Sequence, residues 1–154
     1  MGRVECQTKW LGGLGFESQI RDNKLVMDAK IEAGGKDQGP TPKEILLASI
    51  CGCSGMDVVS ILQKMRLNLI SCEVNAHTET TSGYPSIFSE VKLHFHVSGS
   101  DIKEEQVLKA VRLSMTKYCG VSAMIVKASP IVYEVFLNGS KVGEGHADFE
   151  TATT

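Results

Sequence analysis

Two cysteines stand one glycine apart in the segment "SICGCSGMDVVS", which runs from Ser49 to Ser60. Thiols at such a spacing can hold a metal ion, form a disulfide, or act singly as nucleophiles. Residues two apart on a helix point about 200° away from each other, so the thiols of Cys51 and Cys53 diverge. This geometry disfavours a shared metal ion or a mutual disulfide, and it favours one bystander and one thiol with a chemical role.

The neighbours of Cys53 indicate that it is the thiol with the role. Gly52, Ser54 and Gly55 leave room for another backbone or a ligand, since glycine inside a helix otherwise costs about 1 kcal/mol relative to alanine. Asp57 lies one turn further along the same face, and an ionised carboxylate there would raise the pKa of the thiol. We therefore expect Asp57 to make a structural hydrogen bond. An alternative of equal weight is that these small residues only mark a place where helices cross.

A long apolar helix is expected to position these cysteines. Thr41 and Glu44 form a capping box around Pro42, and the helix can run to about Arg66. Apolar residues cover most of its circumference, which predicts that it is buried nearly all round, with Met56 in the buried surface.

Alternating apolar and polar residues predict strands on both sides of this helix. Three short antiparallel strands precede it, a hairpin of two long strands follows it, and a last hairpin turns at Asn138 and Gly139. In the long hairpin, Val91, Leu93, Phe95 and Val97 are expected to face the core. The expected strands are 4–10, 16–20, 24–27, 69–79, 87–97 and the two arms of 131–145.

A second helix is predicted from about Ile102 to Tyr118, with Asp101 and Glu104 as its capping box, and a short helical segment follows Gly120. Strands and helices alternate in blocks and not as single strand-helix units. The predicted fold class is therefore α+β with a mostly antiparallel sheet, in a single domain spanning residues 1–154.

Composition excludes several classes of partner. The 154 residues are 42% hydrophobic and carry a net charge of -2, so no basic field attracts nucleic acid or anionic lipid. The start, "MGRVECQTKW", lacks the pattern of a secretion signal, and no stretch is expected to reach the roughly 20 apolar residues of a membrane span. These features predict a cytoplasmic protein with no nucleic-acid or membrane partner. In that reducing compartment, structural disulfides among the five cysteines would be rare.

Other candidate clusters carry less weight. His94 and His96 share one strand face, which His77 could join, and this spacing suits a metal ion, but solvated residues on the outer sheet face are favoured. Cys6 and Cys72 lie in strand patterns and are expected to pack. The glycine-rich segments lack the motifs of nucleotide loops. No metal and no cofactor is predicted.

Two segments together resemble a known family. "EAGGKDQGPTPKEILLASICGCSGMDVVSILQKMR" and "YCGVSAMI" are similar to the OsmC/Ohr family of organic hydroperoxide reductases, most of all to its YhfA-like branch. The resemblance implies an intertwined homodimer with the long apolar helices at its centre and with cysteine sites at the subunit interface. It places the family's reactive cysteine on Cys53 and the second cysteine on Cys119.

The chemistry that the resemblance implies is reduction of organic hydroperoxides in oxidative stress defence. A Cys53 thiolate would attack the O–O bond and become a sulfenic acid, and Cys119 would condense with it to a disulfide that an external thiol or dithiol reduces. Cys119 precedes a predicted helical turn, whose N–H groups are expected to lower its pKa. Cys53 lies about three turns inside its helix and needs a nearby cation.

The peroxidases of this family use an arginine and a glutamate beside the thiol, and this chain departs at both places. The glutamate position after the helix-start proline is Lys43, with Glu44 one residue later. Leu14 occupies one family position for arginine, and Lys30 aligns near the other. We expect Lys36, in the "GGKDQG" loop, to supply the cation, although lysine lacks the planar fork of arginine.

Two rival hypotheses remain open. The first is a dimeric small-molecule binding protein with this fold and weak catalysis, as the missing arginine and glutamate suggest. The second, with less support, is a protein whose cysteines bind a metal ion such as zinc.

Overall fold

The computed structural model describes residues 2–149, which form two compact units divided between Leu46 and Leu47. The prediction of a single domain therefore stays a prediction.

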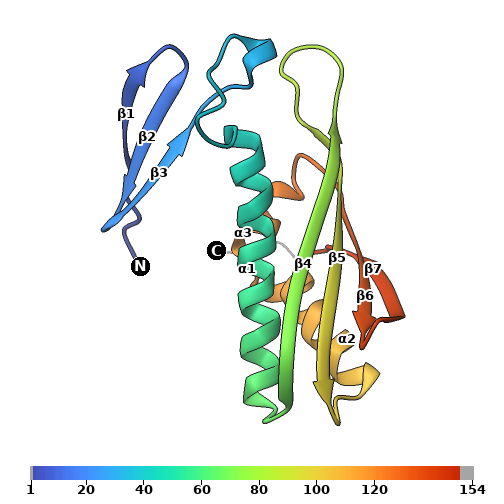
Figure 1. Cartoon of the computed structure of the whole chain (residues 1–154). Coiled ribbons are helices and arrows are strands. Elements are labelled where there is room, and N and C mark those ends of the chain that lie inside the picture. The colour runs from blue at the N-terminus through green and yellow to red at the C-terminus, as the bar shows by residue number, and fades with distance from the viewer. Residues whose placement is uncertain (1, 150–154) are drawn as a thin grey trace. The chain divides into compact units, whose positions relative to one another are not determined.

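The first unit contains the expected three-stranded antiparallel sheet, in the order β1-β2-β3 (Figure 1). Gly12 and Gly13 turn the chain between the first two strands with φ angles of 100° and 58°, which glycine adopts without steric cost. The first strand begins later than predicted, so Cys6 precedes it and is exposed, and its expected packing role was wrong. The strands are β1 Gln7–Gly12, β2 Gly15–Ile20 and β3 Asn23–Met27.

A buried carboxylate holds the glycine-rich connection after β3. Asp28 accepts hydrogen bonds from the backbone N–H groups of Ala29, Lys36 and Gln38, at 2.8, 3.0 and 3.2 Å. Burial opposes ionisation of Asp28, but these donors outweigh it and hold the pKa below its usual range. The loop, which includes the short 3-10 helix η1 (Ile31–Ala33), is thus tied to one ionised side chain.

Helix α1 (Pro42–Lys64) begins as predicted. The backbone N–H of Thr41 donates to Glu44 Oε2 at 2.7 Å, and the N–H of Glu44 donates to Thr41 Oγ1 at 3.4 Å. This reciprocal pair is the capping box that the sequence predicts.

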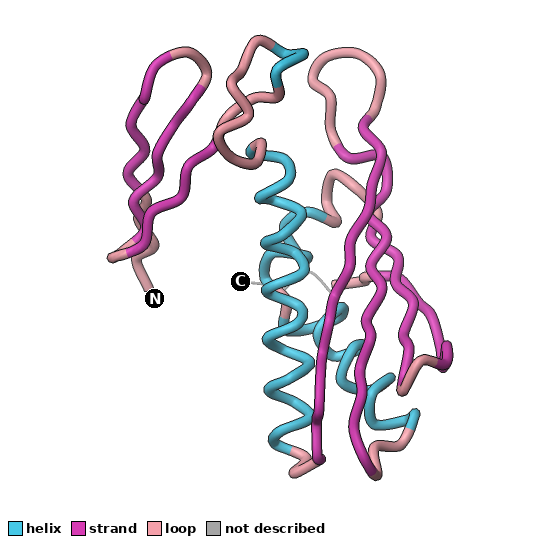
Figure 2. The backbone as a smooth tube through the Cα atoms, in the orientation of Figure 1, coloured by secondary structure: helices cyan, strands magenta, loops and turns pink. Residues whose placement is uncertain are grey.

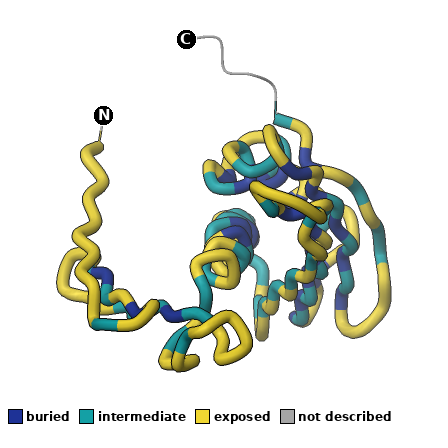
Figure 3. The backbone as a smooth tube through the Cα atoms, turned by 90° about the horizontal axis from the view of Figure 1, so that it is seen from above, coloured by how far each residue is buried: buried dark blue, intermediate teal, exposed yellow. Residues whose placement is uncertain are grey.

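The prediction that α1 is buried nearly all round was wrong for the single chain. Its buried residues recur every fourth position along one face, and Met56 is 75% exposed. In Figure 3 the buried positions likewise lie on one side of the helix. One chain supplies packing partners for only that face. The fully buried residues of the helix are Ile50, Ser54, Val58 and Leu62.

Helix α1 is also long and apolar for a helix of a small domain. By length and composition alone, Pro42–Lys64 is apolar enough to cross a membrane. A helix that packs in the core of a domain has the same length and composition, so this match alone does not place α1 in a membrane.

The second unit contains a four-stranded sheet in the order β4-β5-β6-β7 (Figures 1 and 2). All neighbours are antiparallel except β5 and β6, which are parallel. The inward residues Val91, Leu93, Phe95 and Val97 are at most 2% exposed, as predicted. The strands are β4 Asn68–Thr80, β5 Phe88–Ser100, β6 Ile131–Leu137 and β7 Ser140–His146.

The crossover between the two parallel strands is helical. It consists of α2 (Glu104–Leu113), the π-helical segment η2 (Ser114–Tyr118) and α3 (Gly120–Ile125). Leu108 of α2 lies directly against Gly143 of β7, where a Cβ atom would clash.

The predicted capping box of the second helix was wrong. Asp101 adopts a left-handed conformation with φ of 60°, so the helix starts later and Lys103 is its N-cap. The backbone N–H of Lys103 donates to the Gln106 side chain at 2.9 Å. A backbone turn at Asp101, invisible in the residue pattern, therefore moved the start of the helix.

The last hairpin turns at Asn138 and Gly139 as predicted, with positive φ angles at both residues. The sequence also predicts a loose tail from about Asp148, but residues 150–154 lie outside the described residues. Asp148 itself donates its N–H to the Met115 carbonyl at 3.1 Å.

Candidate active site

Cys53 lies on the packed side of α1, beside the fully buried Ser54. The Ser54 hydroxyl donates back to the Ile50 carbonyl at 2.8 Å, so this polar residue is satisfied within its own helix. Gly55 brings the helix close to the sheet, because a Cβ atom there would lie 3.3 Å from Val74 Cγ2. The predicted close approach is thus confirmed for Gly55, whereas a Cβ atom at Gly52 would have no neighbour within 4 Å among the described residues outside its own helix backbone.

Cys119 stands where η2 ends and α3 begins, and it is fully buried. Its thiol lies 3.0 Å from Ser122 Oγ and accepts the N–H of Ser122 at 3.4 Å. The side chain therefore serves as the N-cap of α3, with a sulfur atom in the place usually taken by oxygen. This cap fixes the direction in which the thiol points.

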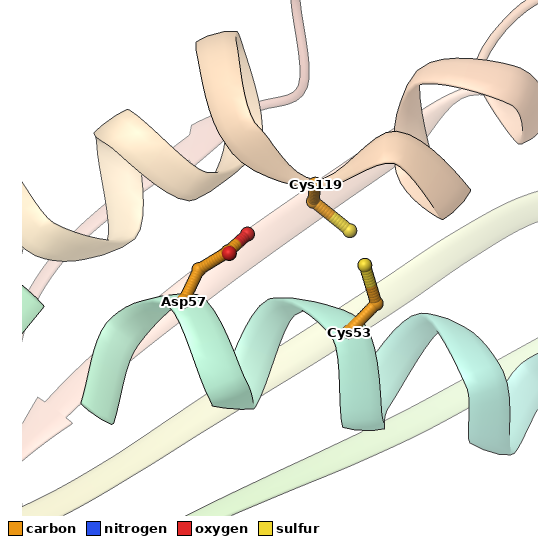
Figure 4. A group of neighbouring side chains, drawn as sticks. All are labelled: Cys53, Asp57 and Cys119. Atoms are coloured by element: carbon orange, nitrogen blue, oxygen red, sulfur yellow. The ribbon is translucent and has the colours of Figure 1, made fainter. Parts of the chain in front are cut away.

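The fold brings the two thiols together. The Sγ atoms of Cys53 and Cys119 and a carboxylate oxygen of Asp57 all lie within 4.8 Å of one another. Figure 4 shows the two thiols pointing at each other between α1 and the η2–α3 junction, with the carboxylate beside them. Two residues that are far apart in the sequence thus share one site, while Cys51 is outside this group.

Asp57 makes the structural hydrogen bond that the sequence suggested. Its Oδ2 atom accepts a bond of 3.0 Å from the hydroxyl of Ser114, the first residue of η2. Ser114 is fully buried, and its oxygen also lies 3.5 Å from the Ser54 carbonyl. The contact ties α1 to the segment that carries Cys119.

Electrostatics at Cys119 differ from the sequence-based expectation. Burial raises its pKa from 9.0 to about 11, the two contacts to Ser122 lower it, and the neighbouring Cys53 raises it further. The helix N-terminus does contribute in the expected direction, but loss of hydration outweighs it. The expected lowering of the Cys119 pKa was therefore wrong, and the thiol keeps its proton.

The remaining half-buried thiols have packing roles. Cys51 and Cys72 both pack against the core, and burial raises the pKa of each. The predictions of a bystander at Cys51 and of packing at Cys72 agree with these positions.

The proposed supporting residues all lie in the first unit. Glu44 accepts the capping bonds of Thr41 and forms an ion pair with Lys30, with Nζ 3.5 Å from Oε1. Lys43 is exposed in the first turn of α1. Lys36 donates its backbone N–H to Asp28, and its charge helps to lower the pKa of that carboxyl. The Lys30–Glu44 pair was not predicted from the sequence.

The histidines form a separate cluster on the outer sheet face. His77 and His94 have ring centroids 5.2 Å apart, and His96 stacks on Phe136 at 4.6 Å. His94 Nε2 lies 3.6 Å from Glu134 Oε2. Within residues 2–149, the one group of three converging ligand atoms is instead that of Cys53, Asp57 and Cys119.

Comparison with known proteins decides the family. Residues 35–134 match the sequence profile of the family described as OsmC-like protein. The chain is also 38% identical over 134 residues to Protein YhfA of Escherichia coli K12, which covers 86% of this chain and 98% of YhfA. This chain belongs to the OsmC-like protein family.

Solved structures share the fold of this OsmC-like chain. A hypothetical protein from Aquifex aeolicus is 28% identical, with a TM-score of 0.77 over 90% of this chain and 99% of its own. An organic hydroperoxide resistance protein, OsmC, from Legionella pneumophila is 14% identical, with a TM-score of 0.61 over 89% and 96%. The predicted family and its α+β fold with a long helix are thereby confirmed.

Two serines of the site were missed in the sequence. In the predicted second helix Ser114 lies between the apolar residues Val111 and Met115, and Ser122 follows Cys119 at the spacing of a capping contact. Both signals are weak, because serine at such positions is common. The π-helical turn before Cys119 left no signal, although such turns frequently mark functional sites.

Proposed function

We propose that this OsmC-like protein is a thiol-dependent peroxidase that reduces organic hydroperoxides. The observation that carries the proposal is the pair of facing thiols, Cys53 and Cys119, with sulfur atoms no more than 4.8 Å apart. A disulfide requires about 2.05 Å, so modest side-chain movement closes the gap.

The reaction has three steps. The Cys53 thiolate attacks the outer oxygen of the hydroperoxide; the O–O bond breaks, the sulfur becomes a sulfenic acid, and the alkoxide takes a proton and leaves as an alcohol. The thiol of Cys119 then attacks the sulfenic sulfur, which forms the disulfide and releases water. An external thiol or dithiol supplies two electrons and two protons to restore both thiols.

The environment of the pair supports this division of roles. Burial and the neighbouring sulfur raise the pKa of Cys119, so it is poorly suited to attack peroxide as a thiolate. As a protonated thiol it can donate a hydrogen bond to an ionised Cys53. Cys53 is also only half-buried, whereas Cys119 is fully buried, so a substrate can reach Cys53 more readily.

Family membership supports the substrate class. The Legionella pneumophila relative in fold is an organic hydroperoxide resistance protein. We propose that Lys36 supplies the cation for the Cys53 thiolate and that Lys43 and Glu44 support it from the helix start. Lys36 is the preferred cation because Asp28 holds its loop, whereas Lys30 is already paired with Glu44.

We further propose a homodimer that works in the cytoplasm. Gly52 has open space around it and Met56, one turn on, is 75% exposed, so α1 presents apolar and small residues that a second copy would cover. A reducing compartment would supply the thiols that regenerate the enzyme.

The test is consumption of cumene hydroperoxide in the presence of a dithiol. We expect the wild type to consume the hydroperoxide and Cys53→Ser to lose this activity. Cys119→Ser should form a sulfenic acid at Cys53 but should be unable to form the internal disulfide. Cys51→Ser, on the same helix, is the matched control and should retain activity. Mass spectrometry of peroxide-treated protein should find a disulfide joining residues 53 and 119.

Equal, slow consumption by all four proteins would contradict the peroxidase proposal. In that case the small-molecule binding hypothesis, which the missing family arginine suggests, gains support.

A further inference from the structure

The reduced site contains a third ligand atom that the peroxidase cycle does not use. The carboxylate of Asp57 lies within 4.8 Å of both thiol sulfurs, and all three side chains point into one space (Figure 4). The divergence of side chains that disfavours a metal ion between Cys51 and Cys53 is absent from this group, because its ligands come from α1 and from the η2–α3 junction.

We propose that Cys53, Asp57 and Cys119 in their reduced state bind a zinc-class divalent metal ion, and that the bound metal blocks peroxide reduction. The second part rests on the proposed function. Binding breaks two S–H bonds, forms two metal–sulfur bonds and one metal–oxygen bond, and releases two protons to solvent.

The geometry suits such an ion. In a tetrahedral zinc site with metal–sulfur bonds of about 2.3 Å, two sulfur ligands are about 3.8 Å apart. The present upper bound of 4.8 Å means that the ligands need to approach by about 1 Å at most. Rotation of side chains on two packed helical segments can supply that movement.

The ligand types select the class of metal. Two thiolates exclude magnesium and calcium, which take oxygen ligands, and favour borderline or soft ions. The carboxylate favours zinc over copper(I), for which two sulfur ligands suffice. Three protein ligands leave the fourth position for water, as in catalytic zinc sites and unlike closed structural ones.

The surroundings already orient the ligands. The Ser114 hydroxyl donates to Asp57 at 3.0 Å, and the N–H of Ser122 donates to the sulfur of Cys119 at 3.4 Å. Such outer contacts hold metal ligands in place in known sites. Because Cys53 and Asp57 are only half-buried, an ion can enter from their side.

The same two sulfurs cannot hold a metal ion and form a disulfide at once. A metal-bound pair has no free thiolate to attack peroxide. The bound metal therefore protects the thiols from oxidation and at the same time inhibits the enzyme.

Cobalt(II) titration of reduced, metal-free protein tests the site, because thiolate ligands give cobalt a charge-transfer absorption band. We expect one cobalt ion per chain, displaced by zinc. Cys53→Ser and Cys119→Ser should each halve the band and weaken binding at least about 100-fold, and Asp57→Asn should weaken it about 10- to 100-fold. Cys51→Ser should bind as the wild type does, and circular dichroism should show that all variants fold.

The metal site is overturned if the wild type shows no thiolate band, or if the band is as strong in Cys53→Ser and in Cys119→Ser as in the wild type. A band unaffected by Asp57→Asn overturns the three-ligand, zinc-class assignment.

Measurements of hydroperoxide consumption with and without zinc distinguish failure of the metal site from failure of the proposed peroxidase function. We expect one equivalent of zinc to stop hydroperoxide consumption and a chelator to restore it. If metal-free protein consumes peroxide and zinc has no effect, the inference fails and the peroxidase stands. If cobalt binds as expected but metal-free protein is inactive, the metal site stands and the peroxidase proposal fails.

Discussion

Ser114 Oγ donates a hydrogen bond of 3.0 Å to Asp57 Oδ2, and this bond joins α1 to the π-helical segment η2. Asp57 lies one turn after Cys53, and Ser114 lies in the turn that leads to Cys119. The bond therefore fixes the separation of the two backbones that carry the thiols. Because Ser114 is fully buried, water cannot replace its hydroxyl.

Removing this hydroxyl should both destabilise the fold and slow the pairing of the thiols. For Ser114→Ala we expect the free energy of unfolding to fall by about 1–3 kcal/mol, because a carboxylate oxygen loses its buried donor. Urea denaturation measures this loss, and a mass-spectrometric time course measures formation of the Cys53–Cys119 disulfide. Ser129→Ala is the matched control, since Ser129 is also buried and donates to the Phe88 carbonyl at 2.8 Å. It should lose stability without slowing the disulfide, and equal disulfide rates in the two variants would refute the positioning role.

The raised pKa of Cys119 predicts a loss of stability at alkaline pH. As the pH rises from 9 towards 11, the unfolded chain releases the Cys119 proton while the folded chain, with a pKa of about 11, retains it. The unfolded state is thereby favoured, so the free energy of unfolding falls across this window. The fall should be steeper in the wild type than in Cys119→Ser, because the other titrating groups are common to both. Parallel stability curves from pH 8 to 11 would show that burial does not perturb this thiol.

The cation proposal predicts a specific effect of Lys36. We expect Lys36→Met to lower kcat/KM for cumene hydroperoxide about tenfold, or roughly 1.4 kcal/mol, and Lys36→Arg to restore it. Lys43→Met removes the same single positive charge and is the control. It should lower kcat/KM by a smaller factor. If kcat/KM falls in Lys30→Met and not in Lys36→Met, then Lys30, which pairs with Glu44, is the cation and the choice of Lys36 is wrong.

The exposed apolar residues of α1, such as Met56, predict that two chains associate through that helix. Met56→Lys places a charge at a side chain that is 75% exposed in the single chain, so it should change the stability of an isolated chain by less than about 0.5 kcal/mol. A dimer that buries this face should dissociate, and sedimentation equilibrium would report the change in mass. Ile70→Lys is the control, because Ile70 is 72% exposed on β4 and not on the helix. The helix interface is excluded if the two variants have the same mass as the wild type.

Local chemistry in the sequence determined most elements and their boundaries. The capping box at Thr41 and Glu44 set the start of α1, and Asn138 with Gly139 set the last turn. Alternation in the long hairpin identified its core face, because neighbouring residues of a strand point to opposite sides. These signals act within a few residues, so they can be recognised without tertiary structure. The start of α2 was misplaced because a left-handed residue at Asp101 leaves no comparable signal.

The sequence by itself also singled out Cys53 through its small neighbours, but its partner Cys119 came from resemblance to the family. Only the tertiary structure brought the two thiols and Asp57 together, and only it reversed the expected direction of the Cys119 pKa. The physical reason is that distance across the fold and loss of hydration both depend on which residues pack together. Packing is a property of the whole chain, and no short pattern around one cysteine contains it.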